Sequence, residues 1–363
     1  MAGRVPNIAS DIADHDPPIR LLTEQGSSDG SGQVLLRSKL RAVSRRMGFS
    51  EAAREHMELA CKEMVTNQVK YAGGAGLVQI WETTRPAPAV DLFAMDFGPG
   101  IPNLPAALED GYTTSGTMGK GLGAIRRLAH ESEFYTIPNG VAPEAPWHGT
   151  AIWARFHPQA PKAAAPFQAG QFLRAYQDGP YNGDCLDLDQ AGSRLRWLHM
   201  DGLGHGAEAH DAVSGSCQAS RLESDLQETL GDLSKRLRGG RGAVALAGEV
   251  DAAQVQARVC GVGDMNAYLI CNGEKRNVTF SPGVLGHAHR SFDETEMAFP
   301  AHALLMTCSD GIRRTWTLGS FPSLWRLHPQ LIALLLGQVL GRGNDDKSLL
   351  VIRSTPAKGG THG

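Results

Sequence analysis

The chain has 363 residues, of which 42% are hydrophobic and 20% are charged, so it is long enough to bury the cores of about two globular domains. Its net charge of −3 and its aromatic content of 6% argue against nucleic-acid binding and against binding to an anionic membrane surface. The N-terminus lacks the apolar core of a signal peptide, and no apolar run reaches the ~20 residues that span a bilayer.

Cysteine usage indicates a reducing compartment. The six cysteines form no CxxC pair, which disfavours a zinc site. We therefore expect reduced core thiols and a cytoplasmic protein, without a disulfide framework. Cys308 belongs to the apolar run 304–308 and is expected to be a buried strand thiol. The six are Cys61, Cys185, Cys217, Cys260, Cys271 and Cys308.

In chain order, the first half predicts an α+β sandwich. Ser50 is the expected N-cap of a helix that starts at Glu51 and has an acidic first turn. Apolar residues recur along this helix at helical spacing, so it is amphipathic. The other expected elements are strands at 78–81, 90–95 and 151–156 and a glycine-opened helix at 122–129.

A stretch at 158–166 has the composition of a linker, because it contains three prolines and four alanines. The predicted domains are therefore residues 19–157 and residues 167–355. The second half also indicates layers of helix and sheet. Helices are expected at 207–219 and 222–237, a buried helix at 331–340, and strands at 185–188, 195–200, 242–247, 255–259, 266–270, 303–307 and 348–352.

Two polar residues of the first predicted helix have the chemistry of a nucleotide site. Glu63 and Asn67 lie four residues apart and therefore share one helix face. The amide oxygen of Asn67 is a hard ligand that suits Mg²⁺. Glu63 can accept a proton from an attacking hydroxyl group or water. Taken alone, such a pair is most often a solvated helix face.

An aspartate and two glycine clusters follow in an order that suits ATP. Asp96, at a strand end, can accept a hydrogen bond from an adenine amino group, and Gly98 and Gly100 remove Cβ atoms that would clash with the ring. A glycine cluster alone is usually a turn, but together with Glu63 and Asn67 this order predicts an ATP site. The second cluster, whose backbone N–H groups can wrap phosphates ahead of a helix, is Gly119, Gly121 and Gly123.

Five motifs of the first half match a known pattern, at residues 63–74, 96–101, 108–115, 119–128 and 148–150. Through them the segment 33–157 resembles the Bergerat-type ATPase superfamily, and within it the RsbT-type switch-protein serine kinases of bacterial stress-response signalling. The resemblance implies ATP and Mg²⁺ as cofactors, with Asn67 as the metal ligand and Glu63 as a candidate catalytic base. It also implies that Asp96 and Thr150 contact the adenine. No phosphoacceptor histidine motif is evident in the sequence, which disfavours a histidine autokinase.

Four aspartates of the second half adjoin apolar strands, which distinguishes them from ordinary Asp-Gly turns. The first three follow a strand and the last precedes one, so we expect the carboxylates to converge at one edge of a sheet sandwich. Two hard cations ~3.5–4 Å apart would activate a water molecule and neutralise a phosphoryl group, and oxygen ligands suit Mg²⁺ or Mn²⁺. The carbonyl oxygen of Gly202 is a further candidate ligand. The four aspartates are Asp184, Asp201, Asp310 and Asp345.

Seven motifs carry a second resemblance, at residues 182–184, 200–206, 239–246, 261–265, 281–286, 309–312 and 345–351. Through them residues 167–354 resemble the metal-dependent protein phosphatases of the PPM family, and specifically its SpoIIE/RsbX branch. This implies a four-layer α-β-β-α sandwich. Two Mn²⁺ or Mg²⁺ ions are then expected at Asp184, Asp201, Gly202, Asp310 and Asp345. Asp184, Asp201 and Glu63 are the predicted catalytic residues.

Three functions are compatible with these patterns. The first is a bifunctional regulator that phosphorylates and dephosphorylates a partner on serine or threonine; by resemblance the partner is a STAS-domain antagonist in a sigma-factor regulatory module. The second is a phosphatase controlled by a nucleotide-sensing domain, and the third is a non-enzymatic switch that sequesters a sigma factor or other output protein. Glu63 beside Asn67 favours the first, because a sensor does not need a base. The input signal and a homodimeric state are left open.

Overall fold

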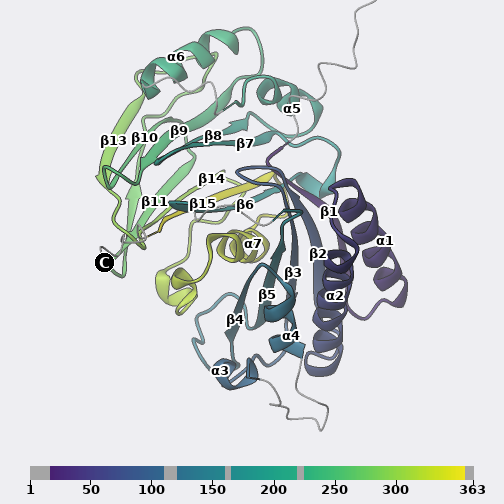
Figure 1. Ribbon diagram of the computed structural model, residues 1–363. Helices are drawn as coiled ribbons and strands as arrows, with labels where there is room; N and C mark the ends of the chain where they lie inside the picture. The colour runs from purple at the N-terminus through teal and green to yellow at the C-terminus, as the bar shows by residue number, and fades with distance from the viewer. Residues whose placement is uncertain (1–16, 110–120, 160–164, 219–224, 356–363) are drawn as a thin grey trace, which may run out of the picture.

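The computed structural model describes residues 17–109, 121–159, 165–218 and 225–355. These residues form three five-stranded sheets, one from the N-terminal half and two from the C-terminal half. Figure 1 shows the sheets in a stack, with helix α7 (Pro329–Leu340) lying between the two halves of the chain.

Within the described ranges, the N-terminal half forms one antiparallel sheet and four helices. The bounds are β1 Ile19–Gly26, α1 Gly30–Arg46, α2 Glu51–Tyr71, β2 Gly76–Thr83, β3 Ala89–Asp96, α3 Leu104–Ala107, α4 Gly121–Leu128, β4 Glu131–Ile137 and β5 Gly149–Phe156. The strand order is β1-β2-β3-β5-β4. Helices α1, α2 and α4 pack on one face, where Leu40, Met57 and Ile125 are buried. Ser50 caps α2 as predicted, because its side chain accepts a hydrogen bond from Ala53 N.

The C-terminal half forms two further antiparallel sheets. Their strands are β6 Phe167–Arg174, β7 Asp184–Ala191, β8 Arg194–Gly202, β9 Ala243–Asp251, β10 Gln256–Val262, β11 Asn266–Cys271, β12 Glu274–Val278, β13 Asp293–Ala298, β14 Leu304–Cys308 and β15 Lys347–Ser354. One sheet has the order β13-β10-β9-β8-β7 and the other β12-β11-β14-β15-β6. Besides α7, the helices are α5 Ala207–Ser214 and α6 Leu226–Arg236, with short 3-10 turns at Tyr176–Asp178, Leu318–Ser320 and Leu324–Arg326.

The two C-terminal sheets pack face to face, as predicted. Trp197 of one sheet and Leu350 of the other belong to the same buried cluster. Helices α5 and α6 cover the outer face of the first sheet, where Val213 and Leu230 pack. Helix α7 covers the outer face of the second sheet. The predicted α+β class and α-β-β-α arrangement are therefore confirmed.

Helix α7 also covers the free face of the N-terminal sheet. One hydrophobic cluster contains Trp81, Phe93 and Trp153 of that sheet, Leu331 of α7 and Phe172 of β6. The layers are thus helices, sheet, α7, sheet, sheet and helices, and the two halves share a core (Figure 1). The run 331–340 is the buried helix that its apolar character predicted. None of the described helices is both long and apolar enough to cross a membrane.

Some predicted boundaries differ from the structure. The helix expected at 207–219 ends at Ser214, and Gly215 is its C-cap. The helix expected at 222–237 is described from Leu226, where the side chain of Asp225 caps it by accepting a hydrogen bond from Glu228 N. Residues 160–164 of the predicted linker lie outside the described residues.

The expectation of reduced thiols was wrong for one pair of cysteines. Cys185 of β7 and Cys217, just after α5, form a disulfide with a Cα–Cα distance of 6.3 Å. The other four cysteines are free, and Cys308 is buried in β14 as predicted. The pair was missed because a separation of 32 residues does not reveal that β7 and the end of α5 meet in space.

Candidate active sites

A cavity of about 390 Å³ opens between α2, β3, β5 and the start of α4. Five of the predicted ATP-site residues line it: Asn67, Asp96, Gly100, Gly121 and Thr150. Residues singled out from the sequence therefore make up part of the cavity lining. The lining residues that it did not single out include Gln68, Ile101, Pro102, Asn103 and Leu122.

Glu63 and Asn67 meet at Gly121. A Cβ atom on Gly121 would lie 3.1 Å from Oε2 of Glu63 and 3.2 Å from Oδ1 of Asn67, so both side chains face the same point. The Nδ2 atom of Asn67 is buried and has no hydrogen-bond partner among the described residues. A buried N–H donor without a partner is costly, and a phosphate oxygen would relieve that cost, while Oδ1 of the same side chain is the kind of oxygen that ligates Mg²⁺. The site therefore fits a nucleotide with its magnesium.

Asp96 is held at the end of β3 by two backbone donors. Its Oδ1 atom accepts hydrogen bonds from Gly98 N at 2.9 Å and Thr150 N at 3.1 Å. Neither bond uses Oδ2, which can therefore accept a hydrogen bond from an amino group. Burial raises the pKa of Asp96, and the two backbone donors oppose this only in part.

The glycines around Asp96 are required by close backbone approach. A Cβ atom on Gly98 would lie 2.7 Å from Cβ of Ala72, and Gly100 has a φ of +73°. Gly149, which the sequence did not single out as a site residue, passes so close that a Cβ atom would lie 2.2 Å from the Asp96 carbonyl oxygen. Gly123 is buried on α4. Gly119 lies outside the described residues.

Thr136 is a second residue that the sequence did not reveal. It pairs with Thr150 across β4 and β5, and the two hydroxyl oxygens are 3.5 Å apart. Its hydroxyl group also accepts a hydrogen bond from Ile101 N and donates one to Gly149 O. Thr136 thus holds the cavity wall in place. Only the pairing of distant strands brings it there, so no local sequence signal could have found it.

The predicted acidic residues of the C-terminal half come to one end of the two sheets. The expectation that Asp184 follows a strand was wrong, because Asp184 is the first residue of β7. It pairs with Asp201, near the end of β8, in the same sheet. Asp310 follows β14 and Asp345 precedes β15, and these two strands are neighbours in the other sheet. Burial and then the charges of Asp184, Asp310 and Asp345 raise the pKa of Asp201. The four carboxylates, of Asp184, Asp201, Asp310 and Asp345, therefore repel one another. We call this group the acidic edge.

This donor set suits divalent cations by charge and by ligand type. Hard cations prefer carboxylate oxygens, and they would relieve the repulsion that raises the pKa of Asp201. Gly202 ends β8 in contact with α5, where a Cβ atom would lie 2.7 Å from Ala209 O. In the described part of the chain no three His, Cys, Asp or Glu side chains are already gathered as the ligands of one ion.

Asp184 is buried and is held by a chain of hydrogen bonds. Ser348 Oγ donates to its Oδ2 atom at 2.7 Å, and His199 Nε2 lies 2.7 Å from the same hydroxyl oxygen. The other ring nitrogen of His199 lies 2.9 Å from Thr307 Oγ1. Burial lowers the pKa of His199 to about 3, so this ring is neutral at physiological pH. No local sequence pattern could have revealed this support, because it comes from strands of both sheets.

Asp346 has a supporting position. Its Oδ1 atom accepts a hydrogen bond from Tyr176 N at 2.7 Å and its Oδ2 atom accepts one from Gly183 N at 2.9 Å. Both carboxylate oxygens are therefore used to fix the loop that leads to Asp184. Asp345, one residue earlier, stays available at the acidic edge.

Comparison with known proteins relates the N-terminal half to a family. Residues 32–142 match the histidine kinase-like ATPase domain. The serine/threonine-protein kinase RsbT of Bacillus subtilis (strain 168) is 34% identical over 123 residues, which cover 33% of this chain and 85% of RsbT.

Solved structures with low identity resemble parts of the chain. RsbX in complex with magnesium has a TM-score of 0.47 and 17% identity, over 53% of this chain and 97% of that chain. The phosphatase domain of SpoIIE from Bacillus subtilis with a fragment of its regulatory domain has a TM-score of 0.45 and 16% identity, over 89% of this chain and 94% of that chain. The sheet sandwich and the acidic edge therefore carry the interpretation of the C-terminal half.

Proposed function

We propose, from the premise that this chain belongs to the family of the serine/threonine-protein kinase RsbT through a histidine kinase-like ATPase domain, that it is a bifunctional partner-switching regulator. The N-terminal half phosphorylates a serine or threonine of a partner protein, and the C-terminal half removes such phosphates. The partner class that we propose is a small STAS-domain antagonist protein in bacterial signalling.

In the kinase half, each residue at the cavity has a separate role. Asp96 accepts a hydrogen bond from the adenine amino group through its free oxygen, and Thr150 contacts the base from β5. Asn67 would hold Mg²⁺, which would neutralise charge on the phosphates. Glu63, beside Asn67 and Gly121, takes the proton of the attacking hydroxyl group.

In the phosphatase half, the carboxylates of the acidic edge act as metal ligands. Two divalent cations, Mn²⁺ or Mg²⁺, would supply a nucleophilic water and charge neutralisation when bound. Asp184 and Asp201 present their carboxylates from adjacent strands, and Ser348 orients Asp184 through its hydroxyl group. Asp310 and Asp345 complete the ligand set from the other sheet, with the carbonyl oxygen of Gly202.

The observation that carries the kinase assignment is the position of Glu63 and Asn67 against Gly121. A domain that only sensed ATP would need Asn67 as the ligand of Mg²⁺ and Asp96 as the contact of the adenine. It would not need a carboxylate beside Asn67 and Gly121. The position of Glu63 therefore supports turnover over mere binding.

The test is a two-stage assay with the full chain. A STAS-domain partner is incubated with the protein, [γ-³²P]ATP and Mg²⁺, and Mn²⁺ is then added. We expect label to enter the partner and then to be released. Asn67→Ala is expected to abolish transfer, and Asp201→Asn to abolish release by removing a metal ligand. Absence of both incorporation and release, with a phosphopeptide also surviving, would contradict the proposal.

A second candidate function is a phosphatase that the ATP domain controls by binding alone. It is favoured by the shared core, since α7 contacts both the N-terminal sheet and the second sheet of the phosphatase half. ATP binding by calorimetry, without phosphate transfer but with a changed rate of phosphopeptide hydrolysis, would favour it over the bifunctional regulator.

A further inference from the structure

We infer that a cavity at the β10–β11 turn is an anion subsite of the phosphatase centre and takes an acidic side chain of the phosphoprotein substrate. This inference rests on the proposed phosphatase function. The cavity measures about 360 Å³. It is lined by residues 263–268, which include the exposed carboxylate of Asp264, by residues 277–280 and by two cations, Lys275 and Arg314.

Lys275 of β12 is held in place without using all of its donors. Its Nζ atom donates to Trp316 O at 2.8 Å and lies 3.8 Å from the centre of the Trp316 ring and 4.9 Å from that of Tyr268. An ammonium group has three N–H donors, so two remain for a ligand. The aromatic rings fix the position of the charge without neutralising it.

Arg314 belongs to the same cavity and is anchored through a backbone group. Its Nη2 atom donates to Asp264 O at 2.5 Å. A guanidinium group has five N–H donors in a planar fork that matches a carboxylate, so most of its donors are left for a ligand. The side chain of Arg314 is exposed and can therefore reach an incoming anion.

Neither cation forms an ion pair with a carboxylate of the described residues. Other cations of the fold do so, for example Arg155 with Asp91 and Arg174 with Glu24. Burial lowers the pKa of Lys275, and the opposing effect of Cys308 offsets this only in part, so its charge is partly desolvated. A bound carboxylate would supply the compensation that the protein itself does not.

The cavity adjoins the acidic edge. The turn that contains Asp264 leads from β10 in one sheet to β11 in the other. Asn266, at the start of β11, pairs with Cys308, two residues before Asp310. Arg314 follows Asp310 by four residues along the chain. A polypeptide whose phosphoserine lies at the carboxylates can therefore place a neighbouring side chain in this cavity.

An acidic side chain is the ligand that these charges favour. The acidic edge repels an anionic substrate unless its carboxylates are neutralised. The cavity lining has two cations against the single carboxylate of Asp264, so it favours one additional negative group. The two cations also fix where that group sits relative to the phosphoserine, so they determine specificity and register.

The experiment uses the full chain with Mn²⁺ and two phosphoserine peptides that differ only in the residues flanking the phosphoserine, glutamate in one and glutamine in the other. The readout is the ratio of their kcat/KM values. We expect the wild type to prefer the glutamate peptide about tenfold. Lys275→Met with Arg314→Gln should bring the ratio to about one. Arg314→Lys keeps the charge but loses the planar fork, so it should retain only part of the preference.

A matched control is Arg276→Gln, which removes an exposed charge from the residue next to Lys275 on β12. It should keep the wild-type ratio. If the double variant does not fold, the single variant Arg314→Gln replaces it, because Arg314 is exposed. Its ratio of kcat/KM values for the two peptides should fall below that of the wild type. A wild-type ratio of one, or an unchanged ratio in Arg314→Gln, would overturn the inference.

Hydrolysis of p-nitrophenyl phosphate distinguishes failure of the proposed phosphatase function from failure of the anion subsite alone. A wild type that cleaves neither this compound nor the peptides defeats the phosphatase function and the subsite with it. A wild type that cleaves it but shows no peptide preference defeats the subsite alone. Inorganic phosphate is the other source of an anion: if Arg314→Gln weakens inhibition by phosphate while leaving the peptide ratio unchanged, the cavity binds the product and the inference fails.

Discussion

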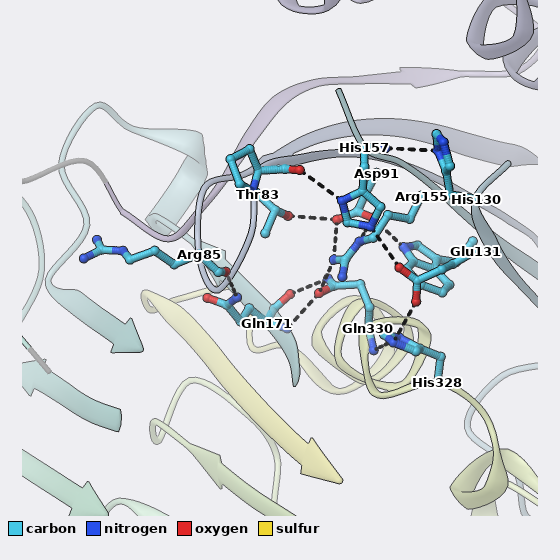
Figure 2. A network of polar contacts seen from close by, with 12 residues as sticks. Thr83, Arg85, Asp91, His130, Glu131, Arg155, His157, Gln171, His328 and Gln330 are labelled. Carbon is cyan, nitrogen blue, oxygen red and sulfur yellow. Dashed lines mark hydrogen bonds and ion pairs between the residues drawn. The ribbon is translucent and has the colours of Figure 1, made fainter. Parts of the chain in front are cut away.

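At the scale of single residues, the boundary between the two halves contains a buried ion pair that is fully hydrogen-bonded (Figure 2). Arg155 donates to Asp91 through Nε at 2.7 Å and Nη2 at 2.8 Å, and Asp91 also accepts hydrogen bonds from Thr83 and Trp153. Arg155 further donates to Oε1 of Gln330 on α7 at 3.2 Å. Because every group has a partner, the charges are tolerated at a buried boundary.

His328 makes this boundary sensitive to acid. Its ring stacks on Trp153 at 4.5 Å, and burial lowers its pKa to about 3. An unfolded histidine has a pKa of about 6.5, so the unfolded chain binds more protons between about pH 3 and 6.5. The folded protein therefore has its full stability with respect to His328 above pH 6.5. Its free energy of unfolding decreases as the pH falls from 6.5 towards 3. At pH 5 the loss from His328 should be about 2 kcal/mol relative to pH 8.

We expect His328→Asn to reduce this acid sensitivity. His328 caps α7 by accepting a hydrogen bond from Gln330 N, and asparagine is a good N-cap without a titrating ring. Urea unfolding at pH 8 and pH 5 measures the effect as the difference in free energy of unfolding. His302→Asn is the control, because His302 is exposed and has a φ of +69°, which asparagine tolerates. Equal pH dependence in all three proteins would refute the assignment.

At the scale of elements, the approach of β6 to α7 depends on Gly170. A Cβ atom on Gly170 would lie 2.0 Å from Pro329 O, a contact that no side-chain rotation can relieve. Gly170→Ala should therefore displace the start of α7 and cost at least about 2–3 kcal/mol in thermal or urea unfolding. Gly215→Ala is the control, since a Cβ atom there meets nothing within 4 Å. A wild-type melting temperature in Gly170→Ala would show that α7 docks less closely.

The disulfide between β7 and the end of α5 predicts a dependence on reducing agents. It closes a separation of 32 residues, for which the loop-entropy relation gives roughly 3–4 kcal/mol of stabilisation. Dithiothreitol, or Cys217→Ser, should lower the melting temperature accordingly. Cys271→Ser, which alters a free and half-buried thiol, should not. If dithiothreitol left the melting temperature unchanged, the disulfide would not contribute to stability.

Local patterns explain what could be predicted from the sequence. The Ser50 cap, the amphipathic helix with Glu63 and Asn67 on one face, and the aspartates at strand ends all follow from short-range periodicity and turn chemistry. What was missed depends on tertiary pairing. Thr136, His199 and the Cys185–Cys217 bond depend on elements that meet only in the folded chain. The second packing face of α7 was also missed, because a uniformly apolar helix does not specify what it contacts.

At the scale of the whole molecule, the same strands line both the cavity beside α2 and the domain boundary. β3 carries Asp91 at the boundary and Asp96 at the cavity, and β5 carries Arg155 and Thr150 in the same way. Helix α7 lies against this sheet and leads on through residues 341–346 to the acidic edge. A continuous set of packed elements therefore connects the two candidate sites, which is a physical basis for coupling between them.

The two halves are consequently expected not to fold independently. Cutting the chain between residues 159 and 165 would leave Trp81, Phe93 and Trp153, all buried in the whole chain, exposed on one fragment and the apolar surface of α7 exposed on the other. We expect the N-terminal fragment alone to aggregate or to lose its near-ultraviolet circular dichroism, and co-expressed fragments to assemble. The full chain should unfold in a single cooperative transition. Two well-separated transitions, together with soluble fragments that melt as they do in the whole protein, would show that the shared core contributes little and that the halves act as separate enzymes.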